Sequence, residues 1–209
     1  MNPSAPLLSG LYLVTPDWDD TAKLLAASEL ALQGGARILQ YRHKTADAAL
    51  RSQQAGALQM LCRRYDCLLI INDYVDLCLA LNADGIHVGG TDISVAAARL
   101  QVGPDKIVGA SCYGDLALAQ RAQQQGASYV AYGGFYPSRV KKYPVTTPLT
   151  IITESRQQIP LPCVVIGGMS SSNCPPLIAA GADMVAAISS IYLADDIKLA
   201  TEEFVALFG

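Results

Sequence analysis

The sequence lacks the features that mark a membrane protein or a secreted protein. Its 209 residues contain no apolar run that approaches the roughly 20 residues of a membrane span. The first fifteen residues, MNPSAPLLSGLYLVT, have no basic segment followed by a long apolar core, as a signal peptide would. We therefore expect a cytoplasmic protein that has no membrane partner.

Charged residues are also scarce. They make up 16% of the chain, and the formal net charge is −3. A weakly acidic chain presents no positive field to the phosphates of nucleic acid, so nucleic acid is excluded as a partner. Hydrophobic residues reach 51%, a high share that suits strands buried on both faces.

No C-x-x-C pair occurs among the cysteines, which mostly stand between apolar residues. We expect reduced thiols in the core, and a disulfide or a zinc site are the alternatives. The six are Cys62, Cys67, Cys78, Cys112, Cys163 and Cys174.

What the sequence has in abundance is short apolar runs that alternate with helical segments. Each run is too short for a typical helix and rich in Val, Ile, Leu or Tyr, as buried strands are. Ala-, Leu- and Gln-rich stretches such as 21–35, 49–65 and 197–208 separate or follow them. The predicted strands are 11–15, 36–42, 67–73, 85–89, 106–111, 129–135, 162–168 and 184–190.

Eight strands alternating with about eight helices predict an α/β fold of the (β/α)8 class, a TIM barrel that forms a single domain over residues 1–209. A doubly wound open sheet is the alternative. The nucleotide-binding patterns G-x-G-x-x-G and G-x-x-x-x-G-K-[ST] are missing. Several helices are predicted to end at glycine, at Gly34-Gly35, Gly126 and Gly181, where a left-handed residue is needed.

Polar residues gather at the predicted carboxyl ends of the strands, where barrel enzymes carry their active sites. The stretch ILQYRHK places Gln40, Arg42 and Lys44 at every second position, so all three side chains point to one face. Many N–H donors and two positive charges suit a polyanion such as pyrophosphate. One cation about 4 Å from an anionic charge gains roughly 4 kcal/mol at an effective dielectric of 20. His43 faces the surrounding helices, and we leave it out of the site.

Two carboxylates converge on the same mouth. Asp73 follows Asn72 at the end of the third strand, and Asp92 follows the fourth strand. A Mg²⁺ ion uses one or two carboxylates together with phosphate oxygens, and it explains the pair. Asp92 also reads as an ordinary N-terminal cap of a helix. We expect His87 to be packed in the core or to support the site rather than to bind a metal.

The loops after the seventh and eighth strands are the usual phosphate site of this barrel. They read GGMSSSN and AISSI, and the helix after residues 170–173 would offer free N–H groups. No convincing nucleophile is present, because Ser111 lacks the nucleophile elbow and Cys112 would point to the opposite side. Two anion sites and a metal predict displacement of a diphosphate by a second, phosphorylated substrate, driven by positioning and charge.

The motifs taken together resemble the thiamine phosphate synthase family over roughly residues 10–195. Any one of them alone is weak, but their combination and order are specific. They are Q-x-R-x-K (40–44), NDYVDLCLALNADGIHVGGTD (72–92), VGAS (108–111), YGGFYPSRVK (132–141), IGGM (166–169) and GADMVAAISSI (181–191).

The resemblance implies a Mg²⁺-dependent transferase on a (β/α)8 barrel. It would join 4-amino-5-hydroxymethyl-2-methylpyrimidine diphosphate to a thiazole phosphate, with or without a carboxylate, and release pyrophosphate. The implied mechanism is dissociative. Oligomeric state is not fixed, and a homo-oligomer is an open alternative. The implied sites are Gln40, Arg42, Lys44, Asn72, Ser111 and Lys141 for the pyrimidine diphosphate, with Arg42, Lys44, Ser111 and Lys141 catalytic; Asp73 and Asp92 for Mg²⁺; and Ser138, Gly168, Ile188 and Ser189 for the thiazole phosphate.

The chain departs from the family pattern in the loop after the sixth strand, where the family has G-P-x-F-P-T-x-T-K. Ser138 and Val140 replace two threonines, and Val140 has no hydroxyl to bind phosphate. Gly90 stands where Gln is common, and Tyr113 where His is frequent. Two alternatives follow. One is a metal-independent thiazole tautomerase, which carries a His where this chain has Gly134, and the other is a non-catalytic barrel that binds thiamine-related phosphates.

Overall fold

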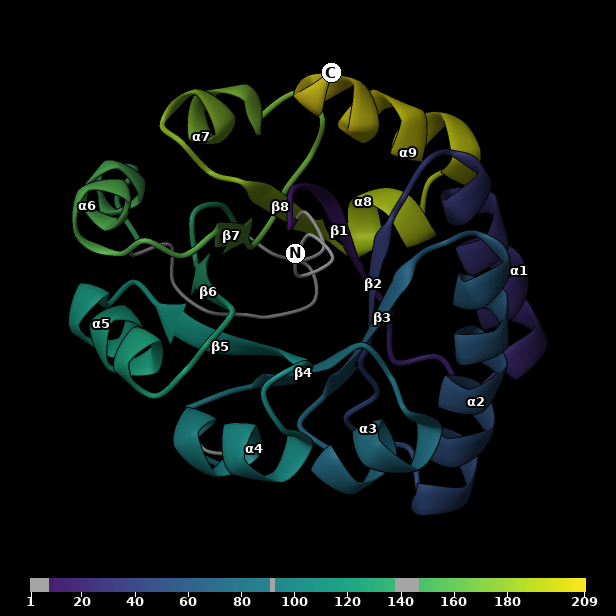
Figure 1. Cartoon of the computed structure of the whole chain (residues 1–209). Coiled ribbons are helices and arrows are strands. Elements are labelled where there is room, and N and C mark those ends of the chain that lie inside the picture. The colour runs from purple at the N-terminus through teal and green to yellow at the C-terminus, as the bar shows by residue number, and fades with distance from the viewer. Residues whose placement is uncertain (1–7, 91–92, 138–146) are drawn as a thin grey trace.

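Eight parallel strands close into a barrel in the structure, a computed structural model that describes residues 8–90, 93–137 and 147–209 (Figure 1). β1 pairs with β2 on one side and with β8 on the other, so that Tyr12 lies opposite both Ile38 and Ala186. The predicted barrel is confirmed, and the open-sheet alternative is wrong. The strands are β1 (Gly10–Val14), β2 (Ile38–Tyr41), β3 (Leu68–Asn72), β4 (Gly85–Val88), β5 (Ile107–Tyr113), β6 (Tyr129–Gly133), β7 (Cys163–Ile166) and β8 (Met184–Ala187).

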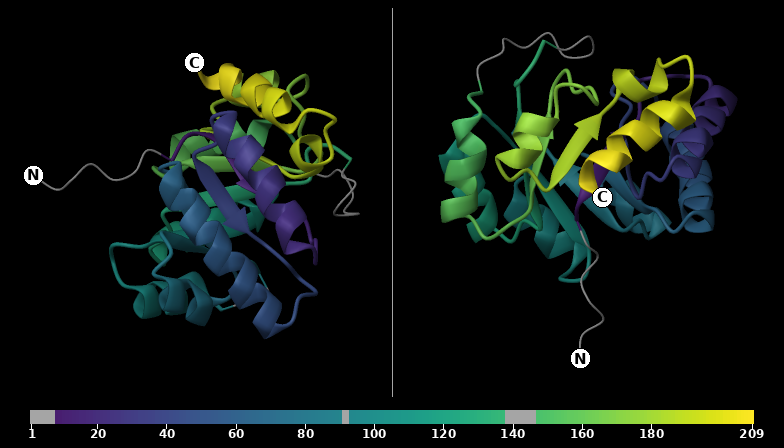
Figure 2. Two further views of the ribbon diagram at one scale, coloured as in Figure 1. Left: turned by 90° about the vertical axis from the view of Figure 1, so that its right-hand side faces the viewer. Right: turned by 90° about the horizontal axis from the view of Figure 1, so that it is seen from above.

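The helices form a ring outside the strands, and α9 packs beside α1 where the ring closes (Figures 1 and 2). Five of them begin at a Ser or Asp whose side chain accepts an N–H of the first turn, as at Asp20 of α1 and Asp47 of α2. They are α1 (Thr21–Gln33), α2 (Ala48–Arg64), α3 (Val75–Leu81), α4 (Val95–Val102), α5 (Leu116–Gln124), α6 (Thr150–Gln158), α7 (Pro175–Ala179), α8 (Ser189–Tyr192), α9 (Ile197–Val205) and the 3-10 turn η1 (Ala206–Phe208).

Glycine ends several helix-to-strand connections, as predicted. Gly35, Gly126 and Gly181 have φ values of 102°, 88° and 109°, in the left-handed region that costs a residue with a Cβ atom. In each case the next residue, an alanine, donates its N–H back to the last turn of the preceding helix. The repeated turn therefore sets the start of the following strand.

Alternation along each strand divides the core into two layers. Leu11 and Leu13 of β1 point outward to the helices, while Tyr12 and Val14 point into the barrel. The hydrophobic part of the inner layer is small, and it ends below the mouth. Its buried members are Tyr12, Val14, Ile38, Ile70, Ile107, Tyr129, Ala131, Val164, Met184 and Ala186.

All six cysteines are buried free thiols, so the prediction of reduced core thiols is confirmed. Cys112 lies in the outer layer, on the face of β5 opposite Ser111. Desolvation by burial raises the pKa of the Cys163 and Cys174 thiols to about 11. These thiols are therefore protonated and unreactive at neutral pH.

One boundary differs from the prediction in a way that matters for the site. Strand eight was expected to continue through Ser190, but β8 ends at Ala187. Ile188 has φ −124° and ψ −85°, which takes the chain out of the extended conformation, and Ser189 begins α8. Ser189 is therefore presented from a helix start.

Candidate active site

A cavity of about 310 Å³ opens at the carboxyl ends of the strands. Its floor is the apolar inner layer of the barrel, represented by Val14, Val164 and Ala186. Most of the described residues that were predicted to bind substrate line it. These are Gln40, Arg42, Asn72, Ser111, Gly168, Ile188 and Ser189.

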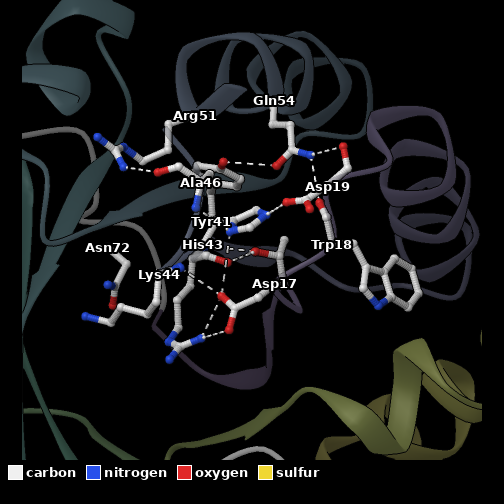
Figure 3. A network of polar contacts seen from close by, with 12 residues as sticks. Asp17, Trp18, Asp19, Tyr41, His43, Lys44, Ala46, Arg51, Gln54 and Asn72 are labelled. Atoms are coloured by element: carbon white, nitrogen blue, oxygen red, sulfur yellow. Dashed lines mark hydrogen bonds and ion pairs between the residues drawn. The ribbon is translucent and has the colours of Figure 1, made fainter. Parts of the chain in front are cut away.

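Arg42 follows β2 directly, and the end of β1 holds it in place. The Thr15 hydroxyl donates to the Arg42 carbonyl at 2.9 Å and accepts its N–H at 2.8 Å. Nη1 of Arg42 lies 3.0 Å from both carboxylate oxygens of Asp17. Asp17 also accepts the backbone N–H of Lys44 at 2.9 Å. Neither Thr15 nor Asp17 was among the predicted site residues, yet together they position both cations. Figure 3 shows Asp17 beside Lys44.

Lys44, Asn72 and Asp73 meet beside this pair. The ammonium of Lys44 forms an ion pair with Oδ2 of Asp73, and Asn72 donates its amide to the same oxygen at 2.6 Å. Asp73 has a φ of 65°, which is rare for a residue with a side chain. Its N–H donates to the His87 carbonyl at 2.9 Å, which holds that conformation.

His43 lies outside this cluster, as expected. Its side chain is fully buried, Nδ1 accepts the N–H of Ala46 at 3.1 Å, and Nε2 lies 3.1 Å from Oδ1 of Asp19. Figure 3 shows it turned toward Asp19, with Gln54 bonded to Tyr41 nearby. His43 therefore shapes the turn that presents Arg42 and Lys44.

Ser111 and His87 both line the cavity, and their side chains contact each other. Nε2 of His87 is 2.8 Å from the Ser111 hydroxyl, and Nδ1 is 2.8 Å from the Tyr129 hydroxyl. The Tyr129 hydroxyl in turn lies 2.6 Å from that of Tyr12. His87 thus supports a site residue, as predicted, but both tyrosines escaped prediction because 117 residues separate them in the chain.

The loop after β7 differs from its prediction. The helix that follows it, α7, begins with Pro175 and Pro176, which have no N–H to offer an anion. The N–H of Ser170 is already bonded to the Asn173 side chain, and the N–H of Asn173 is bonded back to Ser170. The prediction of free helical N–H groups here is therefore wrong.

Gly168 instead contributes close backbone packing. Its φ is 64°, and a Cβ atom there would lie 2.3 Å from the Pro137 carbonyl oxygen. Only glycine permits this approach of the β6–α6 and β7–α7 loops. The two loops together form one wall of the cavity.

Two of the departures from the family pattern contact each other. The N–H of Gly90 donates to the Tyr113 hydroxyl at 3.2 Å, and a Cβ atom on Gly90 would lie 3.2 Å from the Tyr113 ring. The Tyr113 ring therefore fills space that a longer side chain at position 90 would need. Gly134, at the position where the tautomerase carries a His, lines the cavity with no side chain.

Three predicted residues lie outside the described residues, namely Asp92, Ser138 and Lys141. Val140 lies there as well. Within the described part of the chain, no cluster of three or more His, Cys, Asp or Glu residues is placed to hold a metal ion. No helix in that part is both long enough and apolar enough to cross a membrane.

Comparisons with known proteins agree on one family. The model of the thiamine monophosphate synthase family matches residues 11–191. A thiamine-phosphate synthase of Janthinobacterium sp. (strain Marseille) is 67% identical over 202 residues, which cover 97% of this chain and 98% of that protein. One from Methylobacillus flagellatus is 47% identical over 206 residues, with 99% and 98% covered.

A solved structure gives the same result. The thiamine phosphate pyrophosphorylase of Pyrococcus furiosus superposes with a TM-score of 0.84 at 30% identity, covering 96% of each chain. The segment that the family model matches begins within β1 and ends within α8, so it includes the whole described site. The chain belongs to the thiamine monophosphate synthase family.

Proposed function

We propose that this chain is a transferase that joins 4-amino-5-hydroxymethyl-2-methylpyrimidine diphosphate to a thiazole phosphate, giving thiamine phosphate and pyrophosphate. The family supports the reaction, because its members carry the name thiamine-phosphate synthase. The observation that carries the assignment of the site is the convergence of Arg42, Lys44 and Asp73 at one mouth of the barrel.

Arg42 and Lys44 bind the diphosphate in this proposal. Arg42 is pre-oriented by Asp17, with its side chain 11% exposed. Lys44 is 45% exposed and now neutralised by Asp73, so an incoming diphosphate competes for it. Both cations are strongest as ligands when the charge on the leaving group grows, which favours cleavage over simple binding.

The donor set fits Mg²⁺. Asp73 provides a hard carboxylate oxygen at the mouth, and the same carboxylate already accepts the Lys44 ammonium. Mg²⁺ prefers such oxygens and keeps several waters, so a single carboxylate with substrate phosphates is sufficient. Asp73 would hold it, with Asp92 as the proposed second ligand. When bound, Mg²⁺ supplies positive charge to the diphosphate oxygens.

The bond changes balance without a protein nucleophile. The C–O bond between the pyrimidine methylene carbon and the diphosphate breaks, and its electron pair leaves with pyrophosphate. The thiazole nitrogen then donates its lone pair to that carbon and becomes the thiazolium nitrogen. The pyrimidine amino group stabilises the intervening cation, and the apolar floor of the cavity keeps water from capturing it.

The thiazole phosphate is assigned to the opposite wall. Gly168, Ile188 and Ser189 line the cavity there. The short helix α8 starts at Ser189, which lines the cavity. Ser138 and Lys141 are proposed to complete the two substrate sites. A cytoplasmic location and a homo-oligomer stay predictions.

Incubation of the purified protein with both substrates and Mg²⁺ tests the proposal. We expect thiamine phosphate and pyrophosphate in equal amounts. Isomerisation of the thiazole without coupling would assign the protein as a tautomerase. Binding of both substrates without turnover would assign the protein as a non-catalytic barrel that binds thiamine-related phosphates.

A further inference from the structure

Five polar side chains form one continuous chain of hydrogen bonds through the barrel interior. The Gln40 amide nitrogen donates to the Tyr12 hydroxyl at 2.9 Å, and the Tyr12 and Tyr129 hydroxyls lie 2.6 Å apart. The Tyr129 hydroxyl meets Nδ1 of His87 at 2.8 Å, and Nε2 of His87 meets the Ser111 hydroxyl at 2.8 Å. The chain therefore links two cavity residues that come from opposite sides of the barrel, β2 and β5.

Tyr129 is the one member of this chain that does not line the cavity, among the residues that the structure describes. Gln40 and Ser111 line the cavity at the two ends of the chain, and Tyr12 and His87 line it between them, whereas Tyr129 is 1% exposed. Desolvation raises the pKa of Tyr12 and Tyr129 well above that of a free phenol, so both hydroxyls keep their protons. The Tyr129 ring also stacks on His87, with centroids 5.6 Å apart and planes 22° from parallel.

Counting hydrogens gives the chain a direction. Because Gln40 donates to Tyr12, the Tyr12 hydroxyl must use its own hydrogen toward Tyr129. Tyr129 then donates to Nδ1 of His87, so the imidazole carries its hydrogen on Nε2 and donates it to Ser111. The Ser111 hydrogen is left to point into the cavity.

The opposite direction leaves a buried group unsatisfied while Gln40 donates. If Tyr129 donated to Tyr12, the Tyr12 hydrogen would need another acceptor. In the part of the chain that the structure describes, the only polar partners of the Tyr12 hydroxyl are Gln40 and Tyr129. A buried hydroxyl hydrogen without an acceptor costs about 1–3 kcal/mol.

We propose that Tyr129 and His87 are positioning residues, which fix Ser111 as a hydrogen-bond donor and Gln40 as an acceptor toward the pyrimidine substrate. The proposal rests on the proposed function for the identity of that substrate. An aminopyrimidine diphosphate has the matching groups, because its amino group donates while its ring nitrogens and diphosphate oxygens accept. A ligand that offers Ser111 a donor in place of an acceptor meets a mismatch there, because the chain reverses only as a whole.

The tautomer of His87 tests the direction without any substrate. The chain has only two histidines, so ¹⁵N NMR of histidine-labelled protein resolves both rings, and a His43→Gln variant assigns them. His43 is an internal reference, because its Nδ1 accepts the Ala46 N–H. We expect protonated Nε2 and bare Nδ1 on His87, and a protonated Nδ1 would overturn the proposal.

Kinetics then test whether the direction matters for the reaction. Tyr129→Phe removes the central hydroxyl, and we expect kcat/KM for the pyrimidine diphosphate to fall about tenfold, mainly through KM, as for one lost hydrogen bond. Tyr132→Phe is the matched control. It removes a buried hydroxyl on the same strand, but on the face toward the helices. That hydroxyl bonds the Ser155 hydroxyl at 2.9 Å. We expect its kinetics to equal those of the wild type.

A double-mutant cycle separates positioning from general stability. If Tyr129 acts through Ser111, Ser111→Ala should cost about tenfold in the wild type but less than about threefold in Tyr129→Phe. Fully additive effects, or equal kinetics for the Tyr129 and Tyr132 variants, would overturn the proposal. A wild-type protein that makes no thiamine phosphate would overturn the proposed function instead, and the NMR result would still decide the direction of the chain.

Discussion

Both carboxylate oxygens of Asp17 lie 3.0 Å from Nη1 of Arg42, and this pair joins the loop after β1 to the end of β2. Asp17 also accepts the backbone N–H of Lys44. One carboxylate therefore fixes the direction of one cation and the backbone of the next. Pre-organised charge of this kind lowers the cost of ordering long side chains when an anion binds.

Replacing Asp17 should impair the reaction although Asp17 does not touch the substrate in our account. For Asp17→Ala we expect kcat/KM to fall roughly tenfold, because Arg42 and Lys44 lose their common anchor. The kcat/KM of Asp17→Asn should lie between those of the wild type and Asp17→Ala, because the Asn amide oxygen still accepts the Lys44 N–H. The matched control is Glu29→Ala, which breaks the exposed pair with Arg64 and should leave steady-state rates unchanged. Wild-type kinetics for Asp17→Ala would contradict the anchoring role.

Gly109 should be intolerant of any side chain. A Cβ atom there would lie 2.0 Å from the Tyr129 ring, so Gly109→Ala should destabilise the fold by about 1–3 kcal/mol, as overpacking does. Gly56→Ala in α2 is the control, because the nearest atom is 3.8 Å away and alanine favours a helix by about 1 kcal/mol. Urea unfolding measures the free energy of unfolding of both variants. Equal values for Gly109→Ala and Gly56→Ala would contradict the close packing of Gly109 against the Tyr129 ring.

Stability should fall at alkaline pH because of the buried thiols. Burial raises the pKa of Cys78, Cys163 and Cys174 from an ordinary value of 9.0 to about 11. Below pH 9 both the folded and the unfolded chain hold these protons, so the stability is fully present. Between pH 9 and 11 only the unfolded chain releases them, and each thiol lowers the free energy of unfolding by up to about 1.4 kcal/mol per pH unit.

Urea unfolding from pH 8 to pH 10.5 measures that decline. The Cys163→Ala variant should show a shallower slope than the wild type, although a cavity makes it less stable at every pH. Identical slopes would show that this thiol does not titrate on unfolding.

Removing divalent cations should stop the coupling reaction. EDTA should abolish thiamine phosphate formation, and added Mg²⁺ should restore it, because the leaving diphosphate then regains a counter-charge beside Asp73. The thermal unfolding temperature without substrates should change little, since Lys44 already pairs with Asp73. Unchanged product formation in EDTA would refute the role of the metal.

Local patterns in the sequence were enough to predict the barrel and one wall of its mouth. Strand-length apolar runs and glycine turns are local signals, and the period of two in 40–44 put Gln40 and Arg42 into the cavity. These features need no knowledge of distant contacts.

The parts that sequence reasoning missed depend on contacts between distant segments. Asp17 stands in TPDWDD, where any acidic residue could cap the following helix, and its pairing with Arg42 appears only when β1 and β2 lie side by side. Tyr12 and Tyr129 look like ordinary strand residues until closure of the barrel brings their hydroxyls together. By contrast, Pro175-Pro176 was a visible local signal against free helical N–H groups.

The location of the diphosphate site is the central claim, and turnover of two variants tests it most directly. Arg42→Ala and Asp73→Ala should each reduce kcat by about 10²–10³-fold, as loss of a charge-stabilising group does, with unfolding curves close to that of the wild type. Arg64→Ala, which removes an exposed ion pair between α2 and Glu29 of α1, should react normally. Near-normal turnover in both site variants would contradict the assignment of the diphosphate to this mouth of the barrel.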